Sequence, residues 1–134
     1  MKTTPELVSP AGGREAAWAA LHYGADAVYI GLPRFSARAD AENVTREDLG
    51  EIVSYAHQLV PRRRVFVTVN TLVQDHELPD LVCLLADVET SGADAVIVQD
   101  LGAMELVRRS FQDLRIHAST QMAVHSLEGA RALK

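Results

Sequence analysis

The chain has 134 residues, 48% of them hydrophobic and 23% charged, and its formal net charge is −5 at pH 7. This composition is typical of one globular domain with a sizeable core, and it excludes a disordered tail, a disulfide-stabilised mini-protein and a general polyanion-binding protein. The longest strictly apolar run covers only residues 16–21 and the amino-terminal residues show no signal-peptide pattern, so we expect a cytoplasmic protein that does not engage a membrane.

Five short apolar runs predict β-strands. In chain order they cover residues 7–9, 27–30, 65–69, 95–98 and 116–119. These runs are rich in β-branched residues and are apolar at nearly every position, instead of alternating with polar residues. They are therefore typical of parallel strands that are buried on both faces.

Amphipathic patterns between these runs predict helices. Residues 14–23 are rich in alanine and are followed by Gly24, a residue type that often ends a helix. Thr45 precedes the next amphipathic pattern. Asp48 follows Thr45 by three positions, which is the spacing of a capping box. Helices are predicted around residues 49–56 and 78–88, on apolar residues spaced three and four positions apart. Two more are predicted around residues 101–111 and from Ser126 onward.

The sequence Gly-Ala-Asp-Ala-Val occurs twice, at residues 24–28 and 92–96. In both copies the glycine follows a predicted helix and the aspartate precedes a predicted strand. Either the ordinary chemistry of a helix-to-strand loop or a duplication accounts for the repeat.

The regular alternation of strand and helix predicts an α/β fold with a parallel sheet. Two architectures fit the pattern, a (β/α)₈ barrel and an open doubly wound sheet. In both, functional side chains gather at the carboxyl ends of the strands.

Uncharged hydrogen-bonding side chains stand at most of these strand ends. Because amide and hydroxyl groups can orient a ligand at a small desolvation cost, we predict that Asn70, Gln99, Ser119 and Gln121 bind substrate. Asn70 has an alternative role as the cap of the turn that follows it.

Two residues are candidates for catalysis, Asp100 and His117. Asp100 has an alternative role as the cap of the next helix. His117 lies two residues before Ser119 and therefore on the same strand face, but a single histidine in a strand is also a common core residue. The sequence contains no HExxH, CxxC or GxSxG motif, and no metal site is predicted.

Arginines occur in a long loop after the second strand and in a cluster before the third. Arg34 and Arg38 lie in the loop of residues 31–44, where they either bind an anionic group of the substrate or form surface salt bridges. The cluster of residues 62–64 is expected to be a solvated loop, with an RNA-binding or acidic-partner surface as the alternative. The single cysteine, Cys83, is expected to be a small buried side chain.

Six stretches, taken together and in order, resemble the amino-terminal part of peptidase family U32, the collagenase-like proteases. They are residues 6–12, 24–31, 34–38, 67–72, 96–102 and 116–121. The resemblance implies a TIM-barrel-like catalytic domain and peptidase activity. Other members of the family hydroxylate ribosomal RNA, transfer RNA or a quinone precursor, and these members resemble iron–sulfur proteins.

The cysteine-containing signature of the family lies beyond the matched stretches. Residues 1–134 are therefore expected to form one incomplete barrel segment, with about five of eight βα units, no cofactor of its own and no activity alone. The resemblance implies an iron–sulfur cluster only for a full-length version, and a peptide or RNA as substrate. The missing half of the barrel or a homo-oligomer would cover the open edges. A non-catalytic open-sheet domain that binds a ligand or a partner chain is the third alternative.

Overall fold

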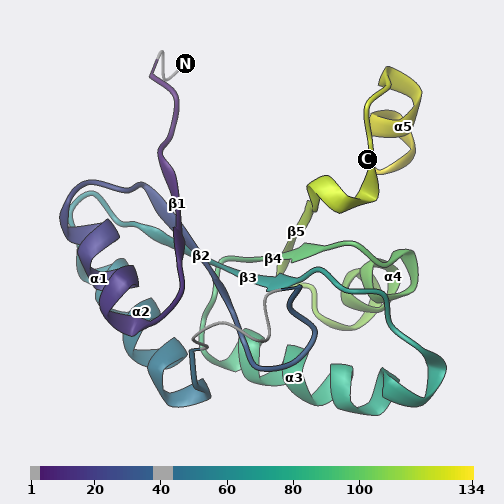
Figure 1. The fold of residues 1–134 in the computed structure, drawn as a ribbon, viewed down its shortest axis with the longest axis horizontal. Coiled ribbons are helices and arrows are strands. Elements are labelled where there is room, and N and C mark those ends of the chain that lie inside the picture. The colour runs from purple at the N-terminus through teal and green to yellow at the C-terminus, as the bar shows by residue number, and fades with distance from the viewer. Residues whose placement is uncertain (1–3, 38–43) are drawn as a thin grey trace.

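The computed structural model describes residues 4–37 and 44–134. Five strands alternate with five α-helices (Figure 1), and two short 3₁₀ turns, η1 (Asp75–Glu77) and η2 (Thr120–Met122), lie between them. The strands are β1 (Val8–Ala11), β2 (Ala27–Gly31), β3 (Arg64–Val69), β4 (Ala95–Val98) and β5 (Arg115–Ala118). The helices are α1 (Arg14–His22), α2 (Arg46–Gln58), α3 (Leu78–Thr90), α4 (Leu101–Ser110) and α5 (Leu127–Ala132).

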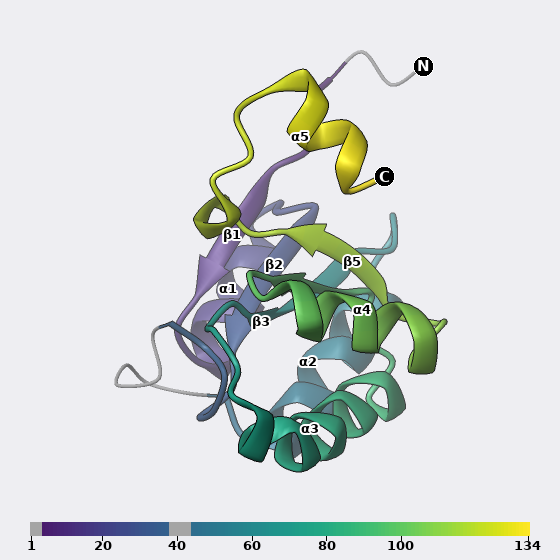
Figure 2. The same cartoon turned by 90° about the vertical axis from the view of Figure 1, so that its right-hand side faces the viewer.

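The five strands form one parallel sheet in the order β1-β2-β3-β4-β5. A doubly wound sheet would reverse its strand order at a switch point, whereas each strand here pairs with the next strand in the sequence. Helices α1 to α4 cover one side of the sheet, and α5 lies beyond the end of β5 (Figures 1 and 2). The fold is therefore that of consecutive units of a (β/α) barrel, as the resemblance implied.

The main core lies between the sheet and these helices. Alternate residues of the central strands face the helices, among them Val28, Ile30, Val67 and Val96, and all four are fully buried. The opposite side of the sheet has a smaller apolar cluster of Ala27, Phe66 and Ala95, with Tyr29 and Ile97 packed against it. The prediction of strands buried on both faces is thus confirmed for β2, β3 and β4.

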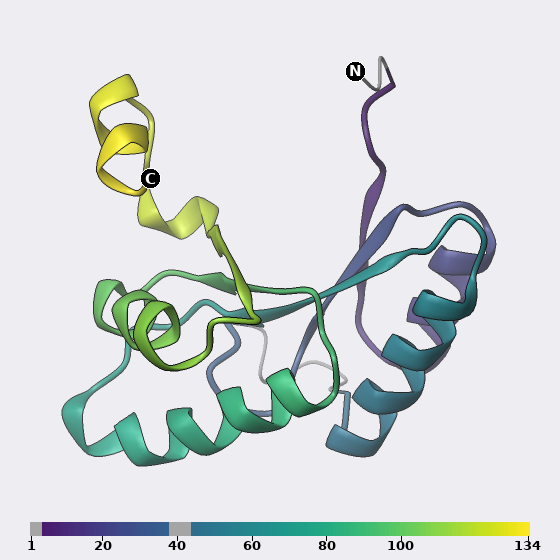
Figure 3. The ribbon, with the colours of Figure 1, turned by 180° about the vertical axis from the view of Figure 1, so that it is seen from behind.

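The two outer strands do not fit that prediction. Val8 and Pro10 of β1 are exposed, and so are Arg115, His117 and Ala118 of β5. Each of these strands has a neighbour on one side only within the described residues, which leaves one face and one edge uncovered (Figure 3). Pro10, which has no N–H to donate, is tolerated because it lies in an outer strand.

The capping box at the start of α2 is confirmed. Thr45 Oγ1 accepts a hydrogen bond from the Asp48 N–H at 3.1 Å, and Asp48 Oδ2 accepts one from the Thr45 N–H at 3.3 Å. Hydrogen bonds from the Thr45 hydroxyl and then from its N–H lower the pKa of Asp48. The shorter aspartate therefore serves in place of the usual glutamate.

The two Gly-Ala-Asp-Ala-Val segments have the same structure. Gly24 and Gly92 have φ angles of 109° and 80°, which favour glycine. The aspartate two positions after each glycine forms two hydrogen bonds with one residue at the start of the neighbouring strand, one through its backbone N–H and one through its carboxylate. Asp26 donates its N–H to Leu7 O and accepts the Leu7 N–H at Oδ2, both at 2.8 Å.

Asp94 repeats these two bonds with Val65, at 2.9 and 2.8 Å. An arginine pairs with each carboxylate, Arg63 with Asp26 and Arg62 with Asp94. Each aspartate therefore holds its own strand in register with the neighbouring one.

One expectation from the sequence was wrong. Cys83 is exposed, because the buried side of α3 is formed by Leu81, Leu84, Leu85 and Val88 and leaves Cys83 on the outside. The expected solvated loop at residues 62–64 is found only in part: the Arg62 side chain is 53% exposed, whereas that of Arg63 is 17% exposed and Arg64 belongs to β3. Across residues 4–37 and 44–134, every helix is too short or too polar to cross a lipid bilayer.

Candidate functional site at the carboxyl ends of the strands

Three of the predicted substrate-binding residues come directly after neighbouring strands of the sheet. The strand register aligns Thr68 with Ile97, and Ile97 with His117. Asn70, Gln99 and Ser119 follow these residues by two positions and stand directly after the last residues of β3, β4 and β5, at the carboxyl edge of the sheet. The side of the sheet opposite α1 to α4 is called the inner face below.

Asn70 is half-buried and links β3 to the loop that follows β2. Its Oδ1 accepts a hydrogen bond from the Ala37 N–H at 2.9 Å. The predicted role as a cap of the next turn is replaced by this longer-range contact. The Asn70 amide nitrogen donates to no atom of the described residues, so it is available to a ligand.

A buried pair of hydroxyl groups supports the same loop. Thr68 Oγ1 donates to Ile30 O at 3.2 Å and lies 3.0 Å from Ser36 Oγ. Because the single hydroxyl hydrogen of Thr68 is used in the first bond, Ser36 is the donor in the second. A Cβ atom at Gly31 would lie 2.5 Å from Ser36 Oγ, so glycine is required for this approach.

Sequence reasoning missed Gly31, Ser36 and Thr68. The signal for Thr68 was a hydroxyl in an otherwise apolar run, and the signal for Gly31 was a glycine at the end of a strand. Neither signal identifies the partner, because residues 36 and 68 meet only in the folded sheet.

Arg34, in the loop after β2, forms a salt bridge with Asp80 of α3. A surface salt bridge is the second of the two roles predicted for Arg34. Its Nη1 lies 2.7 Å from Asp80 Oδ2, and its guanidinium group lies 4.9 Å from the centre of the Phe35 ring. Both side chains are well exposed, so their ion pair contributes little free energy. An anionic ligand that displaced Asp80 from Arg34 would therefore sacrifice little. Arg38 lies outside the described residues, and its predicted role stays a prediction.

Asp100 is the N-cap of α4. Its Oδ1 accepts the Ala103 N–H at 2.8 Å, and its Oδ2 accepts the Val73 N–H at 3.4 Å. Both oxygens are thus engaged with backbone groups, in agreement with the alternative role given above. The adjacent Gln99 is half-buried and directly follows the last residue of β4.

Ser119 and Gln121 are in contact, although by a different geometry than strand alternation predicts. β5 ends at Ala118, and Ser119 is the N-cap of η2. Ser119 is 7% exposed, and its Oγ accepts the Gln121 N–H at 3.2 Å. The Gln121 Oε1 lies 3.4 Å from the same hydroxyl, so the two side chains form one polar group.

His117 lies one row further from the strand ends. Its imidazole packs edge-on against the Phe66 ring, with 4.7 Å between the ring centres. Burial, followed by the positive charges of Arg64 and Arg115, lowers the pKa of His117. No serine or cysteine side chain in the described part of the chain is hydrogen-bonded to a histidine, so His117 has no nucleophile beside it.

The described residues do not fit an iron–sulfur cluster. Cys83 is the one cysteine in the sequence, and it lies on the exposed side of α3. Within residues 4–37 and 44–134, no three histidine, cysteine, aspartate or glutamate side chains are grouped as metal ligands.

These features define a chain with a (β/α)-barrel fold and a polar site at the carboxyl ends of its strands. The sequence profile of peptidase family U32 matches residues 12–134, and the chain belongs to this family. The resemblance seen in the sequence is thereby confirmed.

Curated relatives carry names for two kinds of activity. A 23S rRNA 5-hydroxycytidine C2501 synthase of Escherichia coli is 42% identical over 128 residues, which cover 96% of this chain and 19% of that protein. The uncharacterized protease MJ0090 of Methanocaldococcus jannaschii is 41% identical over 124 residues, with coverages of 92% and 30%. The tRNA hydroxylation protein P of Escherichia coli is 38% identical over 117 residues, with coverages of 87% and 25%. The chain thus spans less than a third of each of these relatives.

A solved structure shows the same fold. The U32 peptidase Mk0906 superposes with a TM-score of 0.73 at 15% sequence identity, and the match covers 99% of this chain and 56% of that one. At this identity the similarity describes the fold alone.

Proposed function

We propose that this chain acts as part of an RNA-hydroxylating enzyme of family U32. The observation that carries the proposal is the 42% identity to a 23S rRNA 5-hydroxycytidine synthase over 96% of the chain. The similarity to a tRNA hydroxylation protein supports the same substrate class. An RNA substrate also agrees with the cytoplasmic location expected from the sequence.

The chemistry of the strand ends supports a nucleobase as the group that is bound. Asn70, Gln99 and Ser119 carry amide and hydroxyl groups directly after three neighbouring strands. Such groups can both donate and accept hydrogen bonds, as the edge of a base requires, and they add no charge that would repel phosphate. Arg34 would exchange Asp80 for a phosphate of the RNA backbone.

A peptidase is the second candidate, because the uncharacterized protease MJ0090 is 41% identical over 92% of the chain. The described residues favour it less. Ser119 is hydrogen-bonded to Gln121, and His117 packs against Phe66. A hydrolytic nucleophile needs a base within hydrogen-bonding distance, and neither residue has such a partner.

The test is to disrupt the encoding gene in its host and to analyse nucleosides from ribosomal and transfer RNA by mass spectrometry. We expect one nucleoside to lose the mass of a single oxygen atom, and the intact gene to restore it. A gene encoding Gln99→Ala should fail to restore it, whereas Gln58→Ala, on the exposed side of α2, should restore it fully. Unchanged RNA together with a loss of gelatin hydrolysis would favour the peptidase.

A further inference from the structure

The loop between β2 and α2 is closed at its base and bent sharply in its first half. The Val44 N–H donates to Gly31 O at 3.3 Å, which joins the two ends of the loop. Phe35 has a φ angle of 60°, in the left-handed region that a bulky residue rarely adopts. Its side chain is 7% exposed and belongs to the main core. Such a conformation persists where the surrounding contacts determine it, and residues held in this way are common at functional sites.

The end of β3 supplies contacts that hold this bend. Thr68 lies in β3, and Asn70 directly follows the strand. Thr68 Oγ1 accepts a hydrogen bond from the Ser36 hydroxyl at 3.0 Å, and Asn70 Oδ1 accepts one from the Ala37 N–H at 2.9 Å. Two successive residues of the loop are thus attached at two points, which fixes the direction of the loop as well as its position.

Arg34 carries the charge of residues 32–37. Its side chain is 53% exposed and that of its partner Asp80 is 57% exposed, so their ion pair contributes little free energy. The guanidinium group also lies 4.9 Å from the centre of the buried Phe35 ring. The loop therefore sets the position of this group more than Asp80 does. A phosphate would meet a charge that is already in place, and less ordering entropy would be lost on binding.

We propose that Thr68 is a positioning residue of the substrate site. Through the Ser36 hydroxyl it fixes the loop after β2, so that Arg34 binds an RNA phosphate while Asn70 binds a base. Thr68 is 8% exposed and its hydroxyl hydrogen is used by Ile30 O, so it acts through the loop and not on the substrate. This inference rests on the proposed function, because it takes RNA as the ligand of Arg34.

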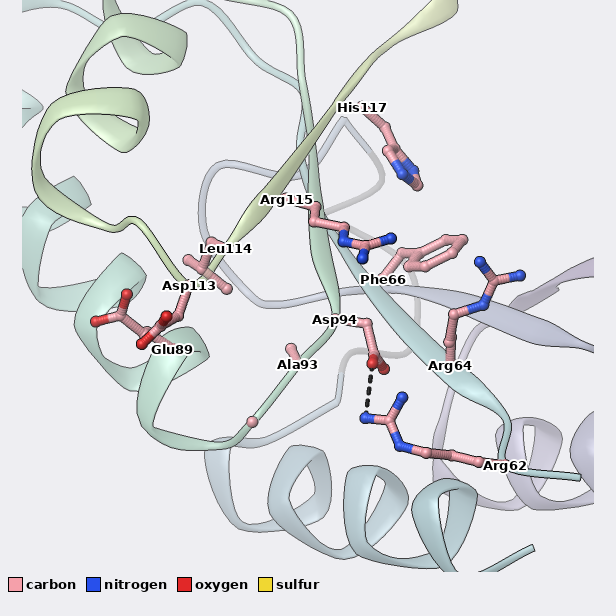
Figure 4. A pocket seen from close by; sticks show the side chains of 11 residues that line it. Arg62, Arg64, Phe66, Glu89, Ala93, Asp94, Asp113, Leu114, Arg115 and His117 are labelled. Atoms are coloured by element: carbon pink, nitrogen blue, oxygen red, sulfur yellow. Dashed lines mark hydrogen bonds and ion pairs between the residues drawn. The ribbon is translucent and has the colours of Figure 1, made fainter. Parts of the chain in front are cut away.

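The opposite end of the sheet is held by charged groups. Figure 4 shows a cavity of about 520 Å³ there, which opens on the inner face near the amino-terminal ends of the strands. Arg62 and Asp94 line it and form an ion pair at 2.9 Å, and Glu89 and Asp113 lie across it. Variants at this end of the sheet therefore serve as controls for changes at Thr68.

The test measures how the purified protein binds transfer RNA and ribosomal RNA from the gene-disruption strain, by filter binding at several salt concentrations. Arg34→Gln should weaken binding about tenfold and reduce the slope of log affinity against log salt by about one, because one phosphate contact is lost. Thr68→Val removes the hydroxyl and keeps the shape of the side chain, so it should weaken binding about fivefold and reduce the slope in the same way.

Two further variants should bind RNA within about twofold of the wild type. Thr68→Ser keeps the hydroxyl that accepts from Ser36. Ser91→Ala is the matched control, because it removes a hydroxyl that donates to Val88 O at 2.7 Å, just before β4 and at the other end of the sheet. A loss of affinity in Ser91→Ala as large as that in Thr68→Val would assign both effects to stability and overturn the inference.

A combination of changes separates positioning from a general loss of stability. Thr68→Val should weaken RNA binding no further in a protein that already carries Arg34→Gln, since Thr68 acts through Arg34. The double variant Ser36→Ala with Thr68→Val leaves neither hydroxyl of the pair without its partner, so it should fold even if Thr68→Val alone does not. Its RNA affinity should fall as that of Thr68→Val does.

The outcomes distinguish this inference from the proposed function. RNA binding that depends on Arg34 but is unchanged in Thr68→Val, or losses that add in the combined variant, would overturn the positioning role alone. A wild-type protein that binds neither RNA would contradict the proposed function and this inference together.

Discussion

Asn70 Oδ1 accepts a hydrogen bond from the Ala37 N–H across 33 positions of sequence, at 2.9 Å. This contact fastens the loop after β2 to the end of β3, so Asn70 positions the segment that carries Arg34. The Asn70 amide nitrogen donates to no atom of the described residues, so the proposed binding role of Asn70 is compatible with this structural one.

The two roles can be separated by substitution. Asn70→Ala should reduce the free energy of unfolding by about 1 kcal/mol, because the Ala37 N–H loses its acceptor. Asn70→Asp keeps an acceptor oxygen, so it should stay within about 0.5 kcal/mol of the wild type while it loses the donor needed for substrate. Urea denaturation of the 134-residue protein measures the first effect. Equal stability of all three proteins would show that the bond does not hold the loop.

Gly31 should tolerate no side chain. A Cβ atom there would meet Ser36 Oγ at 2.5 Å, so Gly31→Ala should cost about 1–3 kcal/mol of stability. Gly12→Ala is the matched control, since nothing lies within 4 Å of a Cβ at that position. The double variant with Ser36→Ala should lose less than the sum of the single changes, because the clashing oxygen is gone. Strict additivity in denaturant melts would argue against the steric explanation.

Asp26 and Asp94 should differ in how much they contribute to the free energy of unfolding. The Asp94 side chain is 12% exposed and the Asp26 side chain 33%. Asp94→Ala should therefore cost about 1–3 kcal/mol, and Asp26→Ala less, because water can reach the Leu7 N–H more easily than the Val65 N–H. Asp80→Ala, which removes an exposed ion pair with Arg34, should cost less than about 1 kcal/mol. Thermal unfolding of the three variants gives the order, and the reverse order would contradict this account.

His117 should make stability depend on pH. Burial, then Arg64 and Arg115, lower its pKa in the folded protein below the ordinary value of about 6.5. Above that value the histidine is neutral in both states. As the pH falls below it, the unfolded chain takes up the proton first, so stability is lost until the folded pKa is also passed.

Urea midpoints between pH 8 and pH 5 should therefore fall more steeply for the wild type than for His117→Gln. His76→Gln, an exposed histidine of η1, should keep the wild-type slope. Parallel curves for the wild type and His117→Gln would mean that the environment of His117 does not disfavour its charge. Glu89 and Asp113, which lie across the cavity, are unchanged in both variants and so cancel in the comparison.

The structural features that depend on residues close together in the chain could be predicted from the sequence. The strands, the capping box of Thr45 and Asp48, and the glycines at residues 24 and 92 all follow from local backbone preferences. Cys83 could also have been placed correctly, since residue 83 is two positions after the buried Leu81 and therefore on another side of α3.

The remaining features depend on strand pairing, which composition and spacing do not specify. The contact of Arg34 with Asp80 joins residues 46 positions apart. The sequence contains many other charged residues, so it does not show that these two pair. The exposure of His117 depends on there being no strand beyond β5 within the described residues. For Asn70, Gln99 and Ser119, the sequence predicted the residue types and the end of the sheet, and the strand order then placed them after neighbouring strands.

The repeated aspartate also specifies alignment beyond a single pair of strands. Asp26 binds Leu7, the residue before β1, through its N–H and its carboxylate. The carboxylate of Asp26 also pairs with Arg63, and its backbone oxygen accepts the N–H of Arg64 in β3. Asp94 likewise binds Val65 of β3 and pairs with Arg62. A one-residue slip of one strand would therefore break contacts to two neighbours at once, so the amino-terminal ends of β1 to β4 align together.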